Sequence, residues 1–333
     1  MNQIALFIIS TENEINLDKD TSYVLMLEAQ RRGFSILICD HRSVNLHNDN
    51  KTVFSKKAYV VEVLEKDFVK ESVFVNSKWG IKSQMKIKSD EDYYILENFN
   101  LTDADLIFMR SDPPVDDEYL QCCSCLEKIQ DEVLIINKPT SLFTNEKLCT
   151  LKWPELIPKT FLIDKPNQSI LEEYIEIFPT GIVIKPLNLC GGEGVQMYNG
   201  RNFDSLNLDN SQYIIQEFIK EVYEGDKRII MLNGEPLGAI LRVAKEGSFI
   251  CNFHAGGSPY PTEINKDDIN ICNKIKSFLI ESGIYFAGID IIGGKLTEIN
   301  ITSPTCVQEI NRANNVKLEK NVLDFIVEKL KTW

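Results

Sequence analysis

Apolar residues at the start of the chain follow the pattern of a β–α–β unit. A continuous apolar run from Gln3 to Ile9 predicts a strand that is buried on both faces. Between Lys19 and Gly33 the apolar residues recur with helical spacing, and Gly33 stands where a helix commonly ends. A second strand is predicted over 36–39. Such a unit is typical of domains that are built on a parallel sheet.

Residues 41–101 are less regular. They mix short β-branched pieces, at 58–64 and 73–75, with clusters of charge, and they predict an antiparallel or irregular excursion from the sheet. The α/β pattern then resumes with a strand over 105–110, a helix after Pro114 and a strand over 133–137.

From Ser141 onward the predicted strands are short and are separated by turn signals. A short helix that contains Glu146 and Lys147 is predicted to begin at Ser141, and Asn233-Gly234 predicts a tight hairpin. The other predicted elements are strands at 161–163, 181–185, 195–198 and 213–218, two strands within 288–301, and helices at 169–178, 266–283 and 317–331.

This change of pattern predicts an α/β (α+β) protein of more than one domain, which a chain of 333 residues is long enough to form. We predict an N-terminal parallel-sheet α/β domain over residues 1–137. A small central domain is expected over 138–215, and a C-terminal antiparallel-sheet domain over 216–333.

Composition and charge narrow the functional classes. The chain has 36 basic and 49 acidic residues and a formal net charge of −13, which disfavours nucleic acid as a partner because phosphate backbones are repelled. No apolar run approaches the ~18 residues of a membrane helix. The first ten residues lack the basic start and the cleavage site of a signal peptide, so a cytoplasmic protein without membrane contact is expected.

Nine cysteines, an odd number, show none of the spacing of a disulfide framework, which agrees with a reducing compartment. The densest group is Cys122, Cys123 and Cys125. Because the chain has only three histidines and this group lacks a fourth ligand, we interpret these thiols as small side chains that pack a helix, not as a zinc site.

The sharpest local signal is a glycine-linked pair of β-rich runs over 288–301. Glu298 and Asn300 are two residues apart and therefore share one face of a strand. A three-residue connection would place Asp290 opposite Glu298 on that face, whereas a two-residue turn would place it on the other face. Such oxygen ligands suit Mg²⁺. The alternative is a solvated polar face on an edge hairpin, and the apolar neighbours favour a central position.

A second signal is a lysine at the end of a strand, followed by a glycine-rich loop. Lys185 precedes Gly191, Gly192 and Gly194, and glycines let backbone N–H groups approach phosphate oxygens closely. The loop is not a Walker A motif, because no Gly-Lys-Ser/Thr follows. A plain β-turn is the simpler alternative, and the lysine at the strand end favours an anion site.

Three further cations are unremarkable when each is taken singly. Lys147 alone would be a surface lysine, as most lysines are. Arg228 and Arg242 lie on predicted strands. In a chain of net charge −13, these cations beside a metal-binding face predict a local anion pocket.

The order of these motifs resembles the ATP-grasp superfamily, and within it the prokaryotic glutathione synthetase family. The strings that carry the resemblance extend along most of the chain outside 41–101. They are Ile15-Asn16 with Lys19-Asp20, Leu27 to Gly33 (LEAQRRG), Met109-Arg110 with Asp112-Pro113-Pro114, Asn137-Lys138-Pro139, Asn145 to Leu148 (NEKL), Lys185-Pro186-Leu187, Gly225 to Arg228 (GDKR), Asn233 to Pro236 (NGEP) and Thr297 to Cys306 (TEINITSPTC).

The resemblance implies an ATP-grasp fold, in which residues 138–215 form the lid domain and 216–333 the catalytic domain. It also implies a role for each matching residue. Lys147 and Lys185, with Gly191 and Gly192, would hold ATP phosphates, and the backbone of Gln216-Glu217-Phe218-Ile219 would read adenine. Asp290, Glu298 and Asn300 would bind Mg²⁺, for which Mn²⁺ is an alternative. Arg228 and Arg242 would be catalytic, and Arg110, Ser303 and Thr305 would lie near the peptide substrate.

The implied reaction is the ATP-dependent ligation of γ-glutamylcysteine with glycine to give glutathione, through an acyl phosphate. The loops 188–194 and 244–257 would serve as lids that exclude water. The family further implies a cytoplasmic homo-oligomer, a tetramer or a dimer, whose partners are small molecules.

The chain departs from the family at two positions where an arginine is usual. Ile250 and Gln308 stand there instead, and they favour the alternative of a divergent ATP-grasp ligase that acts on another dipeptide or amine. A third hypothesis is an ATP-binding module without catalysis, which would show erosion of the metal-binding face. Because Asp290, Glu298 and Asn300 are all present, that hypothesis is the weakest of the three.

Overall fold

The structure is a computed structural model. It describes residues 3–10, 16–63, 65, 85–86, 95–187, 189, 191–201, 203–209 and 211–333. Two compact units divide the chain. Unit 1 comprises residues 1–143, 278–286 and 301–333, and unit 2 comprises 144–277 and 287–300. The three-domain division after residues 137 and 215 stays a prediction.

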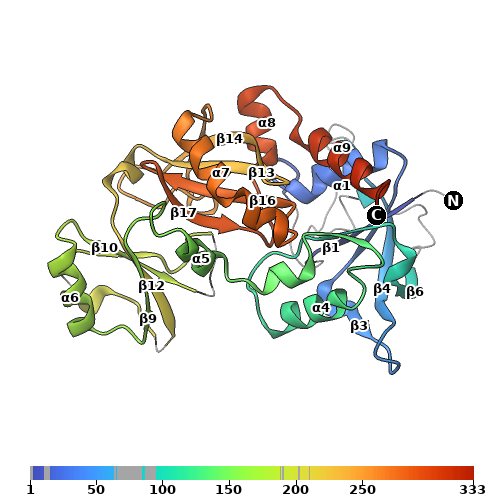
Figure 1. Cartoon of the computed structure of the whole chain (residues 1–333), viewed down its shortest axis with the longest axis horizontal. Coiled ribbons are helices and arrows are strands. Elements are labelled where there is room, and N and C mark those ends of the chain that lie inside the picture. The colour runs from blue at the N-terminus through green and yellow to red at the C-terminus, as the bar shows by residue number, and fades with distance from the viewer. Residues whose placement is uncertain are drawn as a thin grey trace, which may run out of the picture. The chain divides into compact units, whose positions relative to one another are not determined.

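Unit 1 is built on a sheet whose central strands are parallel, as the β–α–β pattern predicts (Figure 1). Its parallel strands follow the order β2 (Ser35–Cys39), β1 (Ile4–Ile8), β7 (Leu106–Met109) and β8 (Leu134–Ile136). Phe7 and Phe108 stack between adjacent strands with their ring centroids 4.5 Å apart. Each of these strands is buried along nearly its whole length, which explains why its sequence is continuously apolar.

The helices of unit 1 begin and end with recognisable signals. In α1 (Thr21–Arg31), the side chain of Asp20 accepts a hydrogen bond from the N–H of Tyr23, and Gly33 follows with φ of 92°. In α4 (Asp117–Glu127), Cys122, Cys123 and Cys125 are buried in the core of the unit. Their packing on a helix is thereby confirmed.

The C-terminal part of unit 1 contains one helix that the sequence analysis did not predict. The predicted final helix is α9 (Leu318–Leu330), but α8 (Val307–Asn314) precedes it. Two features hide α8 in the sequence. Its first turn has no side-chain cap, because Cys306 occupies the N-cap position with φ of 87°, and its segment has few apolar residues.

An antiparallel extension of the sheet covers the irregular stretch, as predicted. The long strand β4 (Val53–Val63) pairs antiparallel with β2 and also with β3 (Val44–Leu46), β5 (Met85–Lys86) and β6 (Ile95–Asn100). The predicted β piece at 73–75 lies outside the described residues.

A buried asparagine joins distant parts of the chain into unit 1. The side-chain amide of Asn137 donates to the carbonyl oxygens of Phe286 and Ile301, at 2.7 and 2.8 Å, and accepts from the N–H of Phe286. These bonds satisfy backbone groups in the interior and explain why the segments 278–286 and 301–333 belong to this unit.

Unit 2 contains two antiparallel arrangements of strands. The first is a four-stranded sheet in the order β11 (Gln196–Tyr198), β10 (Ile182–Pro186), β12 (Gln212–Glu217) and β9 (Thr160–Asp164). Ile182, Ile184 and Ile215 point from one face into a core with Leu171 of α6 (Gln168–Ile177). Because side chains alternate between faces, the residues that follow Ile184 and Ile215, which are Lys185 and Gln216, lie on the opposite face.

The second sheet of unit 2 has five strands. Their order is β15 (Ser258–Pro261), β14 (Glu235–Val243), β13 (Asp226–Leu232), β16 (Phe286–Ile292) and β17 (Lys295–Asn300), and α7 (Lys266–Glu281) precedes β16 in the chain. The predicted hairpin is confirmed between β13 and β14. Asn233 and Gly234 have φ of 49° and 80°, the left-handed values that a tight hairpin turn requires.

The helix predicted to run from Ser141 through Glu146 is wrong in its start. A 3₁₀ helix covers Pro139–Phe143, and a separate helix, α5 (Glu146–Cys149), follows it. The side chain of Asn145 caps the start of α5, because it accepts hydrogen bonds from the N–H groups of Lys147 and Leu148.

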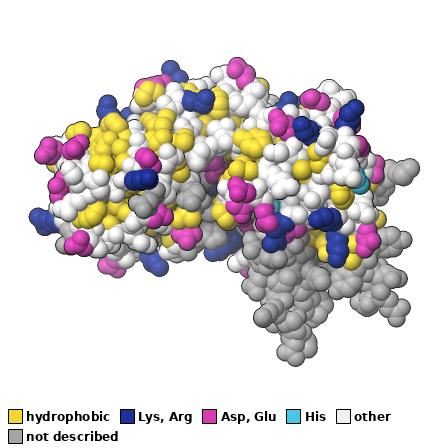
Figure 2. Space-filling model, turned by 90° about the horizontal axis from the view of Figure 1, so that it is seen from below, with side chains coloured by type: hydrophobic (Ala, Val, Ile, Leu, Met, Phe, Trp, Pro, Cys, Tyr) yellow, Lys and Arg dark blue, Asp and Glu magenta, His cyan; other side chains and the backbone are white. Residues whose placement is uncertain are grey.

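The surface of the molecule carries both signs of charge. Over the face that Figure 2 draws, basic and acidic side chains are interspersed among apolar ones, so the acidic excess is not gathered into a single patch there. Among the described residues, no helix is both long enough and apolar enough to cross a membrane.

Candidate active site

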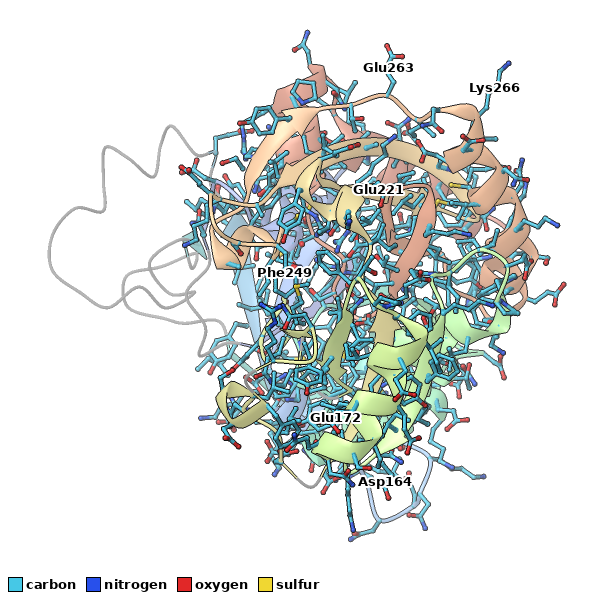
Figure 3. The ribbon with its side chains drawn as sticks, turned by 90° about the vertical axis from the view of Figure 1, so that its left-hand side faces the viewer. Asp164, Glu172, Glu221, Phe249, Glu263 and Lys266 are labelled. Carbon is cyan, nitrogen blue, oxygen red and sulfur yellow. The ribbon has the colours of Figure 1, made fainter. Side chains whose placement is uncertain are left out.

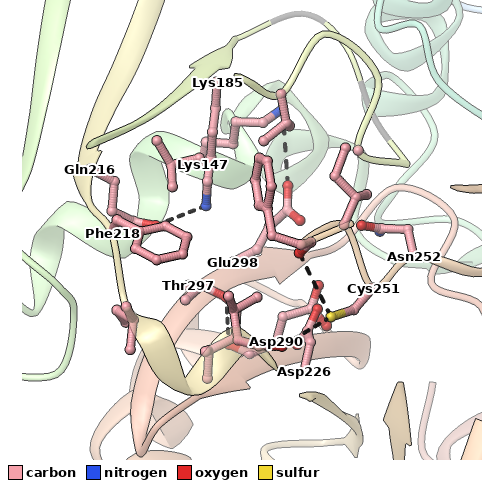
Figure 4. A pocket seen from close by; sticks show the side chains of 18 of the residues that line it. Lys147, Lys185, Gln216, Phe218, Asp226, Cys251, Asn252, Asp290, Thr297 and Glu298 are labelled. Atoms are coloured by element: carbon pink, nitrogen blue, oxygen red, sulfur yellow. Dashed lines mark hydrogen bonds and ion pairs between the residues drawn. The ribbon is translucent and has the colours of Figure 1, made fainter. Parts of the chain in front are cut away.

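A pocket that is partly open to solvent lies within unit 2 and is lined by residues of both of its sheets (Figure 4). Most of the residues predicted for the nucleotide and the metal line it: Lys147, Lys185, Gly191, Gly192, Gln216, Glu217, Phe218, Ile219, Asp290 and Glu298. Two further predicted residues, Arg228 and Arg242, contact Asp290 from behind the pocket wall.

Two lysines on the wall formed by the four-stranded sheet and α5 are held by neutral acceptors. The ammonium of Lys185 donates to Oε1 of Gln216 at 2.8 Å. That of Lys147 donates to the carbonyl of Leu189 and lies 4.0 Å from a carboxylate oxygen of Glu298. Burial lowers the pKa of Lys185, against the opposing effect of Glu298. Both cations are therefore placed to meet an anion.

The glycine-rich loop approaches a second loop too closely for side chains. Gly191 and Gly192 have φ of 63° and 86°, in the left-handed region. A Cβ atom on Gly192 would lie 2.6 Å from Cγ2 of Ile250. The predicted loop 244–257 thus touches the glycine loop, in which residues 188 and 190 lie outside the described part.

Apolar side chains line one part of the pocket, which we call the apolar slot. Its walls are Val183, Phe218, Val222 and Cys251, with Val195, Met197, Phe249 and Ile292 packed against them. The rings of Phe218 and Phe249 meet edge to face at 6.2 Å, and Figure 3 shows Phe249 among the surrounding elements. Such a slot beside the end of β12 suits a flat heterocyclic base.

Two backbone N–H groups of the segment predicted to read adenine already have partners. The N–H of Glu217 donates to Lys159 at 2.8 Å, and that of Phe218 donates to Gly181 at 3.1 Å. Hydrogen bonds from these two groups to a base would require the present ones to break. Reading of the base is therefore expected to use other groups of the segment.

The hairpin that carries the predicted metal ligands resolves the alternative left open by the sequence. The connection is the two-residue turn Gly293-Gly294, yet Asp290 pairs directly with Glu298. The two-residue turn and this pairing are both possible because the register shifts at Thr297. This one extra residue on β17 places Glu298 on the same face of the hairpin as Asp290. The amide nitrogen of Asn300 lies 3.3 Å from Asp290, so the three predicted ligands are neighbours.

These side chains fit a hard divalent cation by the chemistry of their donors. All three offer oxygen, and Glu298 lines the pocket with a partly exposed side chain. Within the described residues, no group of three acidic, histidine or cysteine side chains forms a metal cage. A cation here would rely on few protein ligands and on phosphate oxygens, as Mg²⁺ commonly does.

Asp290 also belongs to a buried network of two arginines and two aspartates. Arg228 reaches both carboxylate oxygens of Asp290, at 2.5 and 3.0 Å. Arg242 contacts Asp290 at 3.0 Å and also Asp226, which is directly opposite it across β13 and β14. All four side chains are less than a tenth exposed. The network fixes the arginines on one side of the pocket.

The pKa values of the two aspartates of the network are shifted in opposite directions. Burial would raise the pKa of Asp290, but Arg228 and Arg242 hold it well below its ordinary value. Burial raises the pKa of Asp226 to about 6, and the charge of Asp290 adds to this effect against Arg242. Oδ1 of Asp226 is buried without a hydrogen-bond partner.

Sequence reasoning missed Asp226 as a residue of the pocket. A signal for it was available, because Asp226 and Arg228 are two apart on a predicted strand and therefore share a face. Thr160 was also missed, although its hydroxyl hydrogen-bonds Gln216 beneath Lys185. That contact depends on the pairing of β9 with β12, which the sequence does not show.

The residues predicted to contact the peptide substrate belong to unit 1. Arg110 is buried, and its Nε donates to the hydroxyl of Ser22 at 3.1 Å. The hydroxyl of Ser303 is 3.4 Å from the carbonyl of Arg110, and Thr305 is exposed. Gln308 donates to the carbonyls of Leu17 and Asp20, at 3.0 and 2.6 Å, which anchors the turn before α1.

A glycine-rich loop with two lysines, an apolar slot and an acidic hairpin lie together on two antiparallel sheets, and this fold is that of the ATP-grasp ligases. Solved structures agree on the fold. D-cycloserine synthetase DcsG superposes with a TM-score of 0.60 at 13% identity, covering 98% of this chain and 99% of that one. A D-alanine–D-alanine ligase from Bacillus anthracis gives 0.54 at 12% identity, with coverage of 100% and 98%.

Sequence comparisons specify the family. The model of the prokaryotic glutathione synthetase N-terminal domain matches residues 4–142, and that of the prokaryotic glutathione synthetase ATP-grasp domain matches 146–315. Glutathione synthetase of Wigglesworthia glossinidia brevipalpis is 37% identical over 96% of this chain and 95% of its own. That of Nostoc sp. is 32% identical over 97% and 98%. The chain belongs to the prokaryotic glutathione synthetase family.

Proposed function

We propose that this chain is an ATP-dependent ligase that joins γ-glutamylcysteine to glycine and releases glutathione, ADP and phosphate. The observation that carries the proposal is the pocket of unit 2, where two lysines on neutral acceptors face a hairpin of oxygen ligands. The full-length similarity to glutathione synthetases supports the substrates.

The chemistry proceeds in two steps. The cysteinyl carboxylate attacks the γ-phosphorus of ATP, and the bond to the ADP oxygen breaks, which gives an acyl phosphate. The neutral amine of glycine then attacks the acyl carbon, phosphate leaves with the electron pair of its bond, and the proton that the amine loses passes to the departing phosphate. No protein nucleophile is needed, so the protein contributes position and charge.

The cations of the pocket divide this work between them. Lys147 and Lys185 are placed to orient the ATP phosphates, with the N–H groups of Gly191 and Gly192. Arg228 and Arg242 would steady the transferred phosphoryl group, in competition with their present partner Asp290. The contact of Gly192 with Ile250 supports the loops as lids that exclude water from the acyl phosphate.

Mg²⁺ is the cation we propose for Asp290, Glu298 and Asn300, with Mn²⁺ as an alternative. When bound, it would neutralise phosphate charge. Arg110, Ser303 and Thr305 are proposed to contact the peptide substrate. We further propose a cytoplasmic homo-oligomer, a dimer or tetramer, that acts on small molecules only.

Phosphate release from ATP, measured with Mg²⁺, γ-glutamylcysteine and glycine while each is omitted in turn, tests the proposal. Release that needs all three, together with glutathione identified by mass spectrometry, is the expected result. Release that occurs without glycine or without the dipeptide would contradict it.

A second candidate is a ligase with a different dipeptide or amine. The observation that favours it is the absence of charge at two positions, since Ile250 packs on Gly192 and Gln308 binds backbone carbonyls. The same assay with other small amines and γ-glutamyl dipeptides separates the candidates. A higher kcat/KM for any of them than for the glycine reaction would favour the second.

A further inference from the structure

A chain of hydrogen bonds runs from the backbone to the lysine of the nucleotide pocket. Lys185 donates to Oε1 of Gln216 at 2.8 Å, and Nε2 of Gln216 donates to the hydroxyl of Thr160 at 2.9 Å. That hydroxyl in turn donates to the carbonyl of Pro158 at 2.7 Å. Gln216 is 4% exposed, so the chain is largely shielded from water.

The donor and the acceptor of every hydrogen bond in this series are fixed by the two groups at its ends, the ammonium of Lys185 and the carbonyl of Pro158. An ammonium has only protons to donate, so it must meet the amide oxygen of Gln216. A peptide carbonyl only accepts, so the hydroxyl proton of Thr160 is used by Pro158. The amide of Gln216 therefore cannot turn over without the loss of a hydrogen bond at each side.

Strand pairing places the three side chains on one face. Gln216 pairs directly with Thr160 of β9, and Lys185 pairs with Ile214, two residues from Gln216 on β12. Lys185 and Gln216 are thus diagonal neighbours, a separation that long side chains can bridge. Because residues 214 and 216 share a face, all three side chains project toward the pocket and away from α6.

The neutral character of this support matters because other charged groups face Lys185. Glu298, Asp226 and Asp290 attract its ammonium, and Lys147 repels it. A carboxylate partner would bind the lysine as an ion pair and would compete with an incoming phosphate. An amide oxygen directs the ammonium without neutralising it.

We propose that Gln216 and Thr160 are positioning residues, which hold the ammonium of Lys185 toward the phosphates of a bound nucleotide and away from Glu298. This inference rests on the proposed function only in that the pocket binds a nucleotide. It assigns to the side chain of Gln216 a role different from the reading of adenine by the backbone of that segment.

Binding of ADP and of adenosine, measured by calorimetry without metal, tests the inference. ADP carries the phosphates that Lys185 would meet, whereas adenosine has none. Gln216→Met should raise the Kd for ADP roughly tenfold, the effect of one lost charge-assisted contact, and should leave that for adenosine within about twofold. Gln216→Glu should weaken ADP at least as much, because its carboxylate would pair with Lys185.

The matched control is Gln212→Met. It makes the same change on the same strand at an exposed position outside the pocket, roughly 13 Å away along β12. It should leave the Kd for both ligands unchanged. An equal loss of adenosine and ADP affinity in Gln216→Met would overturn the inference, because Gln216 would then act on the base.

Two further changes test the hydrogen-bond relay, which is the series of hydrogen bonds from Lys185 through Gln216 and Thr160 to Pro158. Thr160→Val removes the hydroxyl that orients the amide and should weaken ADP about threefold to tenfold, whereas Thr160→Ser should restore affinity to within about twofold. In a Lys185→Met background, Gln216→Met should have no further effect on ADP. An additive loss in the double variant would contradict action through Lys185, and so would unchanged ADP binding in Thr160→Val.

The outcome is independent of the substrate assignment. If the pocket binds ADP but glutathione is not formed, the proposed reaction fails while the relay is still tested. If glutathione forms while Gln216→Met binds ADP normally, the relay alone fails. Should Gln216→Met not fold, as judged by its circular dichroism, the Thr160 pair carries the test.

Discussion

The two walls of the pocket hold their charges in different ways. On the four-stranded sheet and α5, Lys185 and Lys147 are bound by an amide oxygen and a peptide carbonyl. On the five-stranded sheet, Arg228 and Arg242 are bound by buried carboxylates, Asp290 foremost. The hydrogen-bond acceptors of the first wall's lysines are therefore neutral, with Glu298 4.0 Å from Lys147, whereas the arginines of the second wall donate directly to buried carboxylates.

The difference shows how one pocket can combine binding with rigidity. A cation on a neutral acceptor keeps its full charge for an incoming anion and exchanges partners at little cost. A buried ion pair fixes geometry, but the removal of one partner leaves an uncompensated charge. We expect changes on the first wall to affect ligand binding, and changes to the buried pairs of the second to affect stability as well.

The largest effect is expected at the exposed edge of the second wall. Glu298→Ala should lower kcat roughly 10²–10³-fold, the usual effect of the loss of one preorganised charged group in an active site. The melting temperature of the variant should stay close to that of the parent, since the ion pair of Glu298 with Lys147 is long, at 4.0 Å. Glu263→Ala, on a side chain that projects outward in Figure 3, is the control. Normal turnover of Glu298→Ala would contradict the metal assignment.

Substitution of a buried aspartate in the same wall should lower the free energy of unfolding. Asp290→Asn removes the charge that both arginines share, and it should lower the free energy of unfolding by about 3 kcal/mol. Urea unfolding without ligands measures this. A change below about 1 kcal/mol would mean that the buried pair is not formed in solution.

Substitution of a lysine on the first wall should change the kinetic constants for ATP. Lys185→Ala is expected to raise the KM for ATP and to lower kcat, so that kcat/KM falls roughly 10–100-fold. Initial rates at varied ATP measure both constants. Lys266→Ala changes an exposed lysine and should leave them unaltered. Unchanged ATP kinetics in Lys185→Ala would remove the basis for a phosphate site at the glycine loop.

The second wall should also respond to pH through Asp226. Its pKa of about 6 in the folded protein exceeds the ordinary 3.8, so the folded state retains a proton that the unfolded state has released. This stabilisation is complete below about pH 4 and is lost as the pH rises through 6. Relative to Asp226→Asn, the parent should lose about 1–3 kcal/mol of unfolding free energy between pH 4.5 and 7 without ligands. Parallel profiles of the two proteins would contradict the shift.

The smallest change in the free energy of unfolding is expected for Lys185→Met on the first wall. Lys185→Met removes a partly buried cation, and the hydrogen-bond acceptor of that cation, Gln216, is neutral. Desolvation lowers the pKa of Lys185. The free energy of unfolding should therefore change by less than about 1 kcal/mol, unlike that of Asp290→Asn. A loss as large as that of Asp290→Asn would show that the two walls do not differ in this way.

The outline of the fold could be predicted because its signals are local. The parallel strands of unit 1 are continuously apolar, and Asn233-Gly234 marks a hairpin by backbone conformation alone. The helix α8 could not be predicted, because its first turn has no capping side chain and few of its residues are apolar. Its position depends on contacts that distant residues make.

The candidate site also has residues that could be predicted from the sequence and residues that could not. Lys185 at a strand end and the paired residues Glu298 and Asn300 were readable from spacing. The pairing of Asp290 with Glu298 was not, because a two-residue turn predicts opposite faces and only the register shift at Thr297 reverses this. The role of Asp226 was likewise hidden until β13 and β14 placed it opposite Arg242.

Local features of the sequence are enough to assign the family, the order of the main elements and the residue types that could hold phosphate and a hard cation. These depend on periodicity, turn chemistry and motif order, which neighbouring residues carry. The acceptor that each cation meets is visible only in the folded chain, since Gln216 reaches Lys185 across strands and Asp290 lies 62 residues from Arg228. Whether a charge is kept available or paired depends on such long-range contacts, and no local pattern records them.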